Sequence, residues 1–179
     1  MSHDHYKHLV MYYRMRYSEN FCDEFAENYR PDNIRVASKI KKFTRVKIHG
    51  QTYCSVEAAS ARGSHIHALF VASPDNNRDE EEEESAPPSL FAGQVLYYFE
   101  HDLRTKGLHR FAMVRYYGQL SSQHLVDTTG VELWKDSFDE LSHYSILPIA
   151  RIYAPFAYAK YKTGNRLAAI PLEPKFHLN

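Results

Sequence analysis

Apolar residues in the N-terminal segment recur every three or four positions, which is the period of an amphipathic helix. They are Leu9, Tyr12, Tyr13, Tyr17, Phe21 and Phe25. The spacing predicts helix over residues 4–29, divided by Ser18 and Asn20 and ended by Pro31. We expect this aromatic stripe to dock on the core of the same chain, with docking on another chain as the alternative.

From Phe43 onward the apolar and polar positions alternate, as they do along β-strands. The predicted strands cover residues 43–48, 51–55, 64–72, 91–100, 109–117, 131–135, 146–153 and 156–161. His49 and Gly50 form a tight-turn signal, so we expect the first two strands to pair as a hairpin. In the fourth strand the alternation puts Val95 on the same face as Tyr97.

Several predicted strands are apolar on both faces, which an open sheet with one solvated face would not show. The pattern therefore predicts a single, mainly β domain, folded as a small, strongly bent barrel that an N-terminal helical arm caps. We assign residues 1–33 to the arm and residues 34–179 to the barrel. The length of 179 residues suits one such domain.

The composition is that of a globular protein, with 44% hydrophobic and 25% charged residues. Cys22 and Cys54 are the only cysteines in the sequence, which excludes a disulfide scaffold and a four-cysteine zinc site. No apolar run reaches the ~18 residues of a membrane span, and the polar residues 1–8 are unlike a secretory signal. We therefore expect an intracellular protein.

Charge is segregated along the chain, although the formal net charge is zero. Residues 79–84 are six consecutive acids, and setting them aside leaves 22 basic against 16 acidic residues. This acidic run lies within residues 73–89, which are rich in proline, aspartate and asparagine. Such a segment repels itself and stays solvated, so we expect a disordered surface loop there.

The basic counterpart is residues 35–47, which contain six basic residues and no acid. Clustered lysine and arginine bind the nucleic-acid backbone irrespective of base sequence. The candidate nucleic-acid contacts are Lys39, Lys41, Lys42, Arg45 and Lys47. The alternative is a solvated strand edge, where lysine discourages pairing with another chain.

Two strand histidines raise a metal-dependent enzyme as a further alternative. His65 and His67 are two positions apart, so they share a strand face and could supply two metal ligands. A third ligand would come from His101 or His109. Half-buried strand histidines without a metal are the simpler interpretation, and we predict no catalytic residue, no metal and no cofactor.

Aromatic residues make up 14% of the chain, and three of them form a candidate binding surface: Tyr98, Tyr116 and Trp134. The alternation predicts Tyr98 and Tyr116 on outer strand faces, where both are exposed in a row unless another element covers them. Three rings around a small pocket would form a cation–π cage for a methylated lysine. The alternative is that the tyrosines pack beneath the N-terminal helix.

Five segments follow the order found in a known family. They read FTRVKIHGQTYCS, SHIHALFVAS, FAGQVLYYFEHDL, HRFAMVRYY and ILPIARIYAPF. Together they resemble the C-terminal accessory module of eukaryotic CACTA-type (En/Spm-like) DNA transposon proteins. The second half also resembles a bromo-adjacent-homology (BAH) domain, because GQVLYYFEH and FAMVRYYG are similar to the paired central strands of that domain.

This resemblance implies an SH3-like or BAH-like barrel that serves as a non-catalytic chromatin or protein interaction module in the nucleus, derived from a transposon protein. Its partners would be chromatin proteins or other chains of a transposon-derived protein, with DNA as an alternative partner. Neither a membrane nor a small-molecule substrate is expected. The acidic run departs from the family pattern, and a full methyl-lysine cage is not matched residue by residue.

Overall fold

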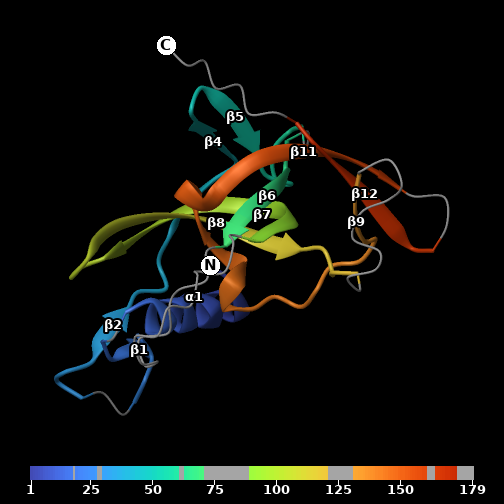
Figure 1. Cartoon of the computed structure of the whole chain (residues 1–179). Coiled ribbons are helices and arrows are strands. Elements are labelled where there is room, and N and C mark those ends of the chain that lie inside the picture. The colour runs from blue at the N-terminus through green and yellow to red at the C-terminus, as the bar shows by residue number, and fades with distance from the viewer. Residues whose placement is uncertain are drawn as a thin grey trace, which may run out of the picture.

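The computed structural model describes residues 1–17, 19–27, 30–60, 63–70, 89–120, 131–160 and 164–172. Its α-helix, α1 (His3–Arg16), precedes every strand (Figure 1). The strands are β1 (Phe21–Asp23), β2 (Ile34–Val36), β3 (Lys41–Phe43), β4 (Arg45–Ile48), β5 (Gln51–Cys54), β6 (His65–Phe70), β7 (Ser89–Leu103), β8 (Gly107–Tyr116), β9 (Glu132–Lys135), β10 (Ile146–Pro148), β11 (Ile152–Lys160) and β12 (Arg166–Pro171). Two short 3-10 helices, η2 (His143–Ser145) and η3 (Ile149–Arg151), flank β10. The acidic loop predicted at residues 73–89 lies outside the described residues, apart from Ser89.

The mainly β fold with an N-terminal helix confirms the coarse fold class predicted from the sequence. The largest sheet runs in the order β10-β8-β7-β6-β11-β12-β9, and β3 pairs separately with β7. β4 pairs with β5 as the predicted hairpin, and β1 pairs in parallel with β2. These sheets are open, and the described residues form no closed barrel. Within the same residues, no helix is long and apolar enough to cross a membrane.

The N-terminal arm is helical over only half of the predicted range. Ser2 caps α1 by accepting a hydrogen bond from the amide of His5, and the helix ends at Arg16. After that the chain becomes extended and forms β1, where a second helix was predicted. That prediction was wrong because Phe21 and Cys22 enter the core from a strand whose backbone bonds with β2.

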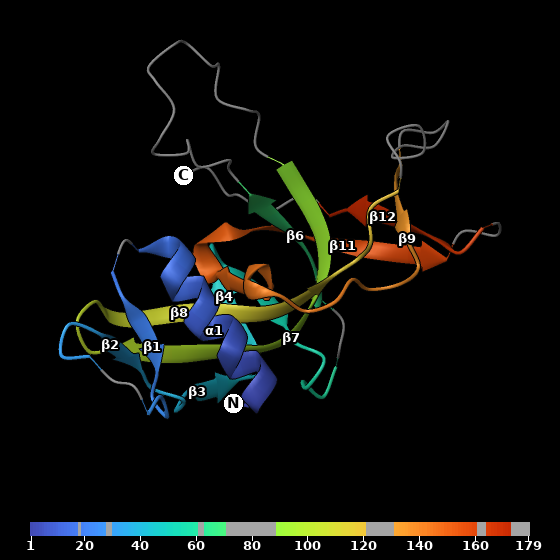
Figure 2. The same cartoon turned by 90° about the horizontal axis from the view of Figure 1, so that it is seen from below.

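The long antiparallel pair β7–β8 is buried on both of its faces. On one face α1 packs against Tyr97, Phe99 and Phe111. Figure 2 shows α1 in front of β7 and β8. On the other face the β4–β5 hairpin packs against Tyr98 and Val114. Figure 1 shows the helix and the hairpin on opposite sides of this pair. Two core clusters therefore lie on opposite faces of the same pair of strands.

A bulge of one residue decides which side chains of β7 face the helix. The register shifts between Val95 and Tyr97, so that Val95 pairs with Val114 and Tyr97 pairs with Met113. Val95 therefore joins Tyr98 in the cluster beneath the hairpin, and the prediction that it shares a face with Tyr97 was wrong. A bulge adds one residue to one strand and reverses the alternation beyond it.

A third core cluster lies among β9, β11 and β12, at the other end of the main sheet. Its buried side chains are Ala92, Tyr117, Trp134, Phe156, Leu167 and Ala169. β11 runs unbroken through Pro155, where two separate strands were predicted. β12 was not predicted, because its sequence RLAAIP does not alternate.

Gly93 provides a test of the packing between β7 and β8. A Cβ atom at this position would lie 2.7 Å from Cγ1 of Val114 and 2.9 Å from Cδ1 of Tyr116. Because these side chains are held in the core, we expect Gly93→Ala to lower the free energy of unfolding by about 1–3 kcal/mol. Urea denaturation at neutral pH measures the change. An unchanged unfolding midpoint would contradict the close approach of these two strands.

Candidate nucleic-acid interface

The five candidate nucleic-acid contacts follow the chain through β3 and β4. We call this set the basic strip; its members are Lys39, Lys41, Lys42, Arg45 and Lys47, and all five are exposed. Along β4, Arg45 and Lys47 are exposed, whereas Val46 and Ile48 pack against the core cluster beneath the hairpin. Alternation along a half-buried strand therefore brings the charged residues to the outside.

Strand pairing fixes the backbone that carries the basic strip. β3 pairs antiparallel with β7, and β4 pairs antiparallel with β5. The turn between β4 and β5 has positive φ at both His49 (47°) and Gly50 (80°). A two-residue hairpin turn of type I′ needs this conformation at both positions. The spacing of the charged side chains is therefore set by the fold before any ligand binds.

Part of the charge of the basic strip is neutralised by acids of the same chain. Nζ of Lys41 lies 3.8 Å from Oε2 of Glu100, and Nζ of Lys42 lies 3.3 Å from Oε1 of Glu57. The Lys42 ammonium also lies 3.8 Å from the centroid of the Tyr97 ring. For the other three members, no carboxylate among the described residues lies within 4.0 Å of a side-chain nitrogen; they are Lys39, Arg45 and Lys47.

A shallow hollow lies where β3 meets β4. It has a volume of about 370 Å³ and is lined by Lys42, Phe43, Thr44 and Arg45. The hollow thus combines two cations, a hydroxyl group and an aromatic ring. Cations bind phosphate groups, and an aromatic ring offers a face to a base or a sugar.

The three aromatic candidates do not lie together on an open surface. The exposed fractions of Tyr98 and Trp134 are 1% and 5%, and the hydroxyl group of Tyr116 is buried. Tyr98 packs beneath the β4–β5 hairpin, Tyr116 packs beside Phe70 and Phe91, and Trp134 belongs to the cluster among β9, β11 and β12. The expectation of an exposed row is therefore corrected, because the hairpin covers Tyr98 and neighbouring rings cover Tyr116. This burial raises the pKa of both tyrosines.

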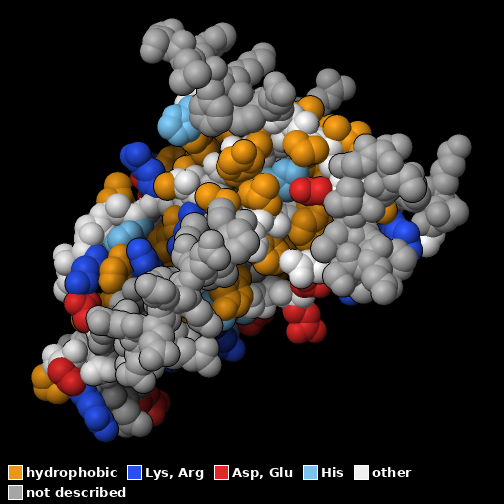
Figure 3. Space-filling model, in the orientation of Figure 1, with side chains coloured by type: hydrophobic (Ala, Val, Ile, Leu, Met, Phe, Trp, Pro, Cys, Tyr) orange, Lys and Arg blue, Asp and Glu red, His pale blue; other side chains and the backbone are white. Residues whose placement is uncertain are grey.

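Tyr116 belongs instead to a set of rings that we call the aromatic group: Phe70, Phe91, Tyr116 and Tyr144. The ring centroid of Phe70 lies 5.1 Å from that of Phe91, 5.7 Å from that of Tyr116 and 6.1 Å from that of Tyr144. At these distances the rings pack edge to face. Tyr144 is the exposed member, at 58%. Hydrophobic side chains also gather over the centre of the face drawn in Figure 3.

The two strand histidines share a face of β6, as predicted, but that face is buried. The exposed fractions of His65 and His67 are 8% and 1%. Their rings pack on aromatic neighbours, with 4.3 Å between the centroids of His65 and Tyr158 and 4.8 Å between those of His67 and Phe156. The described residues contain no group of three or more histidine, cysteine, aspartate or glutamate side chains that could hold a metal ion.

The expected third ligands lie near the other end of β7. His65 pairs with the N-terminal part of β7, whereas His101 and His109 face each other close to the β7–β8 turn. His101 is engaged at both ring nitrogens, with Nδ1 2.8 Å from the hydroxyl of Tyr13 and Nε2 2.9 Å from the carbonyl oxygen of Ala37. Neither histidine therefore completes a site with His65 and His67.

One buried polar contact was not predicted from the sequence. Nε2 of His67 lies 3.3 Å from Oε2 of Glu132. The imidazole holds the pKa of the Glu132 carboxyl below its usual value. The indole nitrogen of Trp134, two residues further along β9, is buried without a hydrogen-bond partner among the described residues. No local pattern signals this contact, because β6 and β9 come together only through β11 and β12.

No family model, no curated protein and no solved structure matches the chain. The resemblance to the transposon-protein module therefore stays a prediction.

The pKa of His65 gives a prediction for acid stability. Burial and the nearby charge of Arg115 lower this pKa from 6.5 to about 4. Between these pH values the unfolded chain binds a proton that the folded protein excludes. The contribution of His65 to the free energy of unfolding is therefore fully present above pH 6.5. It falls by about 3 kcal/mol as the pH drops towards 4.

Urea denaturation between about pH 7 and about pH 4 measures this loss. His65→Phe keeps an aromatic ring against Tyr158 and removes the titrating group. We expect the variant to lose less stability than the parent over the same interval, by about the 3 kcal/mol assigned to His65. Parallel pH profiles for the two proteins would contradict the burial of His65 as a neutral ring.

Proposed function

We propose that the chain is a non-catalytic interaction module that binds nucleic acid through the basic strip, irrespective of base sequence. The observation that carries this proposal is the set of exposed cations without a carboxylate partner among the described residues: Lys39, Arg45 and Lys47. An unpaired cation binds phosphate without first breaking an ion pair. The paired strands β4 and β5 fix the backbone at Arg45 and Lys47, which lowers the entropy lost on binding.

The hollow beside β3 and β4 supports the same proposal with a second kind of contact. Lys42 and Arg45 provide charge for a phosphate group, and the ring of Phe43 lies between them in sequence and lines the same hollow. Each phosphate that is neutralised releases counterions, and the logarithm of affinity falls with the logarithm of salt concentration by about 0.9 per contact. Engagement of the whole strip would therefore give a slope of about −4 to −5.

The double variant Arg45→Gln/Lys47→Gln tests this proposal. It removes two unpaired cations and leaves the partly buried Val46 and Ile48 of the same strand in place, so we expect the fold to be kept. Affinity for duplex DNA at low salt should fall about tenfold or more, and the salt slope should shrink by about 2. Fluorescence anisotropy with a labelled duplex over a salt series measures both quantities.

Arg104→Gln/Lys135→Gln is the matched control. It removes two exposed cations, which have no carboxylate partner among the described residues, from the β7–β8 turn and from the end of β9, both outside the basic strip. It should change the affinity by less than about twofold, because separated surface charges are screened. Equal losses in the two double variants would show that DNA responds to net charge rather than to the strip. Failure of the parent protein to bind DNA at low salt would refute the proposal.

We also propose that the sheets belong to an SH3-like or BAH-like barrel, as the resemblance to the transposon-protein module implies. Two hydrogen bonds support this architecture. The amide of Lys135 donates to the carbonyl oxygen of Gly118 over 2.9 Å. The amide of Gly118 donates in turn to the carbonyl oxygen of Ser137 over 3.0 Å. They join the chain just after β8 to the end of β9, the last strand of the main sheet. A bent sheet returns on itself in this way when a barrel forms.

Chromatin-protein binding in the nucleus is the second candidate function, together with the origin in a transposon protein that the resemblance implies. The aromatic group supports it, because the exposed Tyr144 lies beside the half-buried ring of Phe70. An exposed ring of this kind attracts a cationic side chain such as a modified lysine of a histone tail. Tyr98 and Trp134 are buried, so the candidate surface moves from those residues to the aromatic group.

Tyr144→Ala separates the two candidate functions. If a modified histone tail is the partner, the variant should bind that peptide about fivefold more weakly and keep its affinity for DNA. Tyr153→Ala is the control, because Tyr153 is also exposed and lies outside the aromatic group. A peptide array followed by calorimetry measures binding. The chromatin candidate fails if the parent binds no peptide, or if both variants weaken binding equally.

A further inference from the structure

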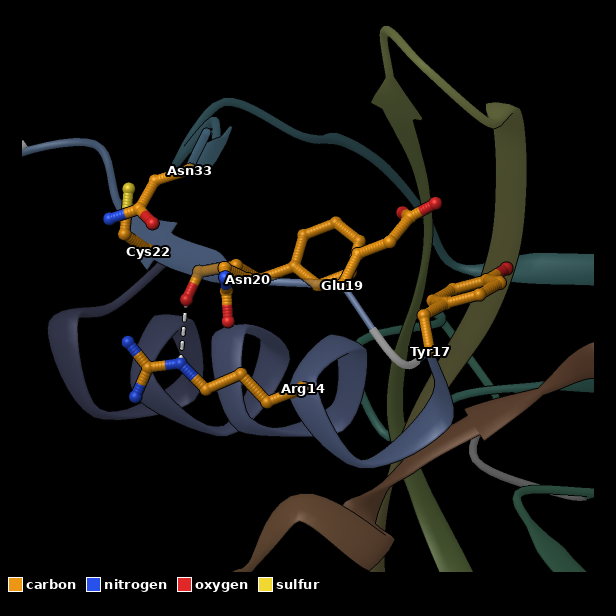
Figure 4. A pocket seen from close by; sticks show the side chains of 7 residues that line it. Arg14, Tyr17, Glu19, Asn20, Cys22 and Asn33 are labelled. Atoms are coloured by element: carbon orange, nitrogen blue, oxygen red, sulfur yellow. Dashed lines mark hydrogen bonds between the residues drawn. The ribbon is translucent and has the colours of Figure 1, made fainter. Parts of the chain in front are cut away.

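A second hollow is built from elements other than β3 and β4. It lies between the C-terminal turn of α1, β1 and the segment that leads into β2 (Figure 4). Its volume is about 550 Å³, which falls in the range of small-molecule sites. We propose that this hollow, the Arg14 pocket, binds a small organic oxyanion, either a carboxylate or a phosphate ester, through the guanidinium group of Arg14.

The guanidinium group of Arg14 is held in place for such a ligand. Its Nε donates a hydrogen bond of 2.7 Å to the carbonyl oxygen of Phe21, drawn as the dashed line in Figure 4. This bond leaves the two terminal nitrogens available, and no carboxylate among the described residues lies within 4.0 Å of them. A planar fork of N–H donors matches the paired oxygens of a carboxylate or a phosphate.

No carboxylate that lines the pocket pairs with Arg14. Glu19 also lines the pocket, but its carboxylate is paired with Nζ of Lys106 at 2.6 Å. Figure 4 shows Glu19 and Tyr17 at the end of the pocket away from Arg14. The negative end of the α1 dipole is close, and it is offset by two arginines in the last turn, Arg14 itself and Arg16.

Two carboxamide side chains add neutral donors to the site. Asn20 comes immediately before β1, and Asn33 comes immediately before β2; both line the pocket. In Figure 4 Asn33 and Cys22 lie together at the end of the pocket that holds the Arg14 guanidinium. The amide of Asn20 is only weakly engaged, with Nδ2 3.5 Å from Oδ2 of Asp32. Amide N–H groups can bind the oxygens of the anion that the guanidinium leaves free.

The rest of the pocket suits the organic part of such a ligand. Phe21 and Cys22 are both buried and line the same space. A single inorganic anion bound at Arg14 would leave much of this volume filled only with water. An organic acid or phosphate ester would cover the apolar wall and contact the guanidinium at the same time, as ligands do in mixed polar and apolar pockets.

An NMR titration of the full chain with benzoate, with phenyl phosphate and with neutral benzamide tests the proposal. Benzoate or phenyl phosphate should shift the backbone amides of Asn20, Cys22 and Asn33 in a saturable way, and benzamide should not. The anion that binds more tightly identifies the ligand as a carboxylate or a phosphate. Arg14→Gln should weaken binding by about tenfold or more. Arg16→Gln, the matched control from the same helical turn, should change the affinity by less than about twofold.

Two further variants keep the test decisive. If thermal unfolding shows that Arg14→Gln is unstable, Asn33→Asp replaces it, because an added carboxylate repels the anion and leaves the bond between Arg14 and Phe21 intact. Arg45→Gln/Lys47→Gln should bind the small anions as the parent does, which separates this pocket from the basic strip. The proposal is overturned if neither anion causes a saturable shift at the pocket, or if Arg14→Gln and Arg16→Gln weaken binding equally.

Discussion

The antiparallel pair β7–β8 is apolar on both faces, and the fold must keep water from both of them. α1 covers one face and the β4–β5 hairpin covers the other. Burying an aromatic side chain in either cluster contributes roughly 2–3 kcal/mol, so neither cover is dispensable. Because the hairpin turns Val46 and Ile48 inward, alternation turns Arg45 and Lys47 outward. The exposed charge of the basic strip is therefore a consequence of how the pair is buried.

Local features of the fold could be predicted from the sequence. The hairpin follows from the turn chemistry of His49 and Gly50, and the exposure of Arg45 and Lys47 follows from alternation along one short strand. Features that depend on distant partners could not be predicted. β1 replaces the expected helix because β2 supplies its hydrogen bonds, and the bulge beside Tyr97 leaves no mark in the apolar pattern.

The candidate sites divide in the same way. Charged residues stay exposed unless paired, so the position of the basic strip could be predicted from its sequence. Aromatic residues give no such guidance, because Tyr98 fits a core as well as a surface, and the cover that buries it comes from another part of the chain. The His67–Glu132 contact and the Arg14 pocket are likewise assembled from segments that meet only in the folded protein. The strip suits an extended polyanion, whereas one fixed guanidinium in a pocket suits a small ligand.

We propose above that nucleic acid binds to the face of β3 and β4. Backbone amide shifts of the full chain, recorded while a short DNA duplex is titrated in at low salt and again at physiological salt, test it most directly. We expect saturable shifts concentrated at Lys39, Lys42, Arg45 and Lys47 that weaken as salt is added. Shifts concentrated on α1 or on β11 and β12, or no shifts at low salt, would contradict it.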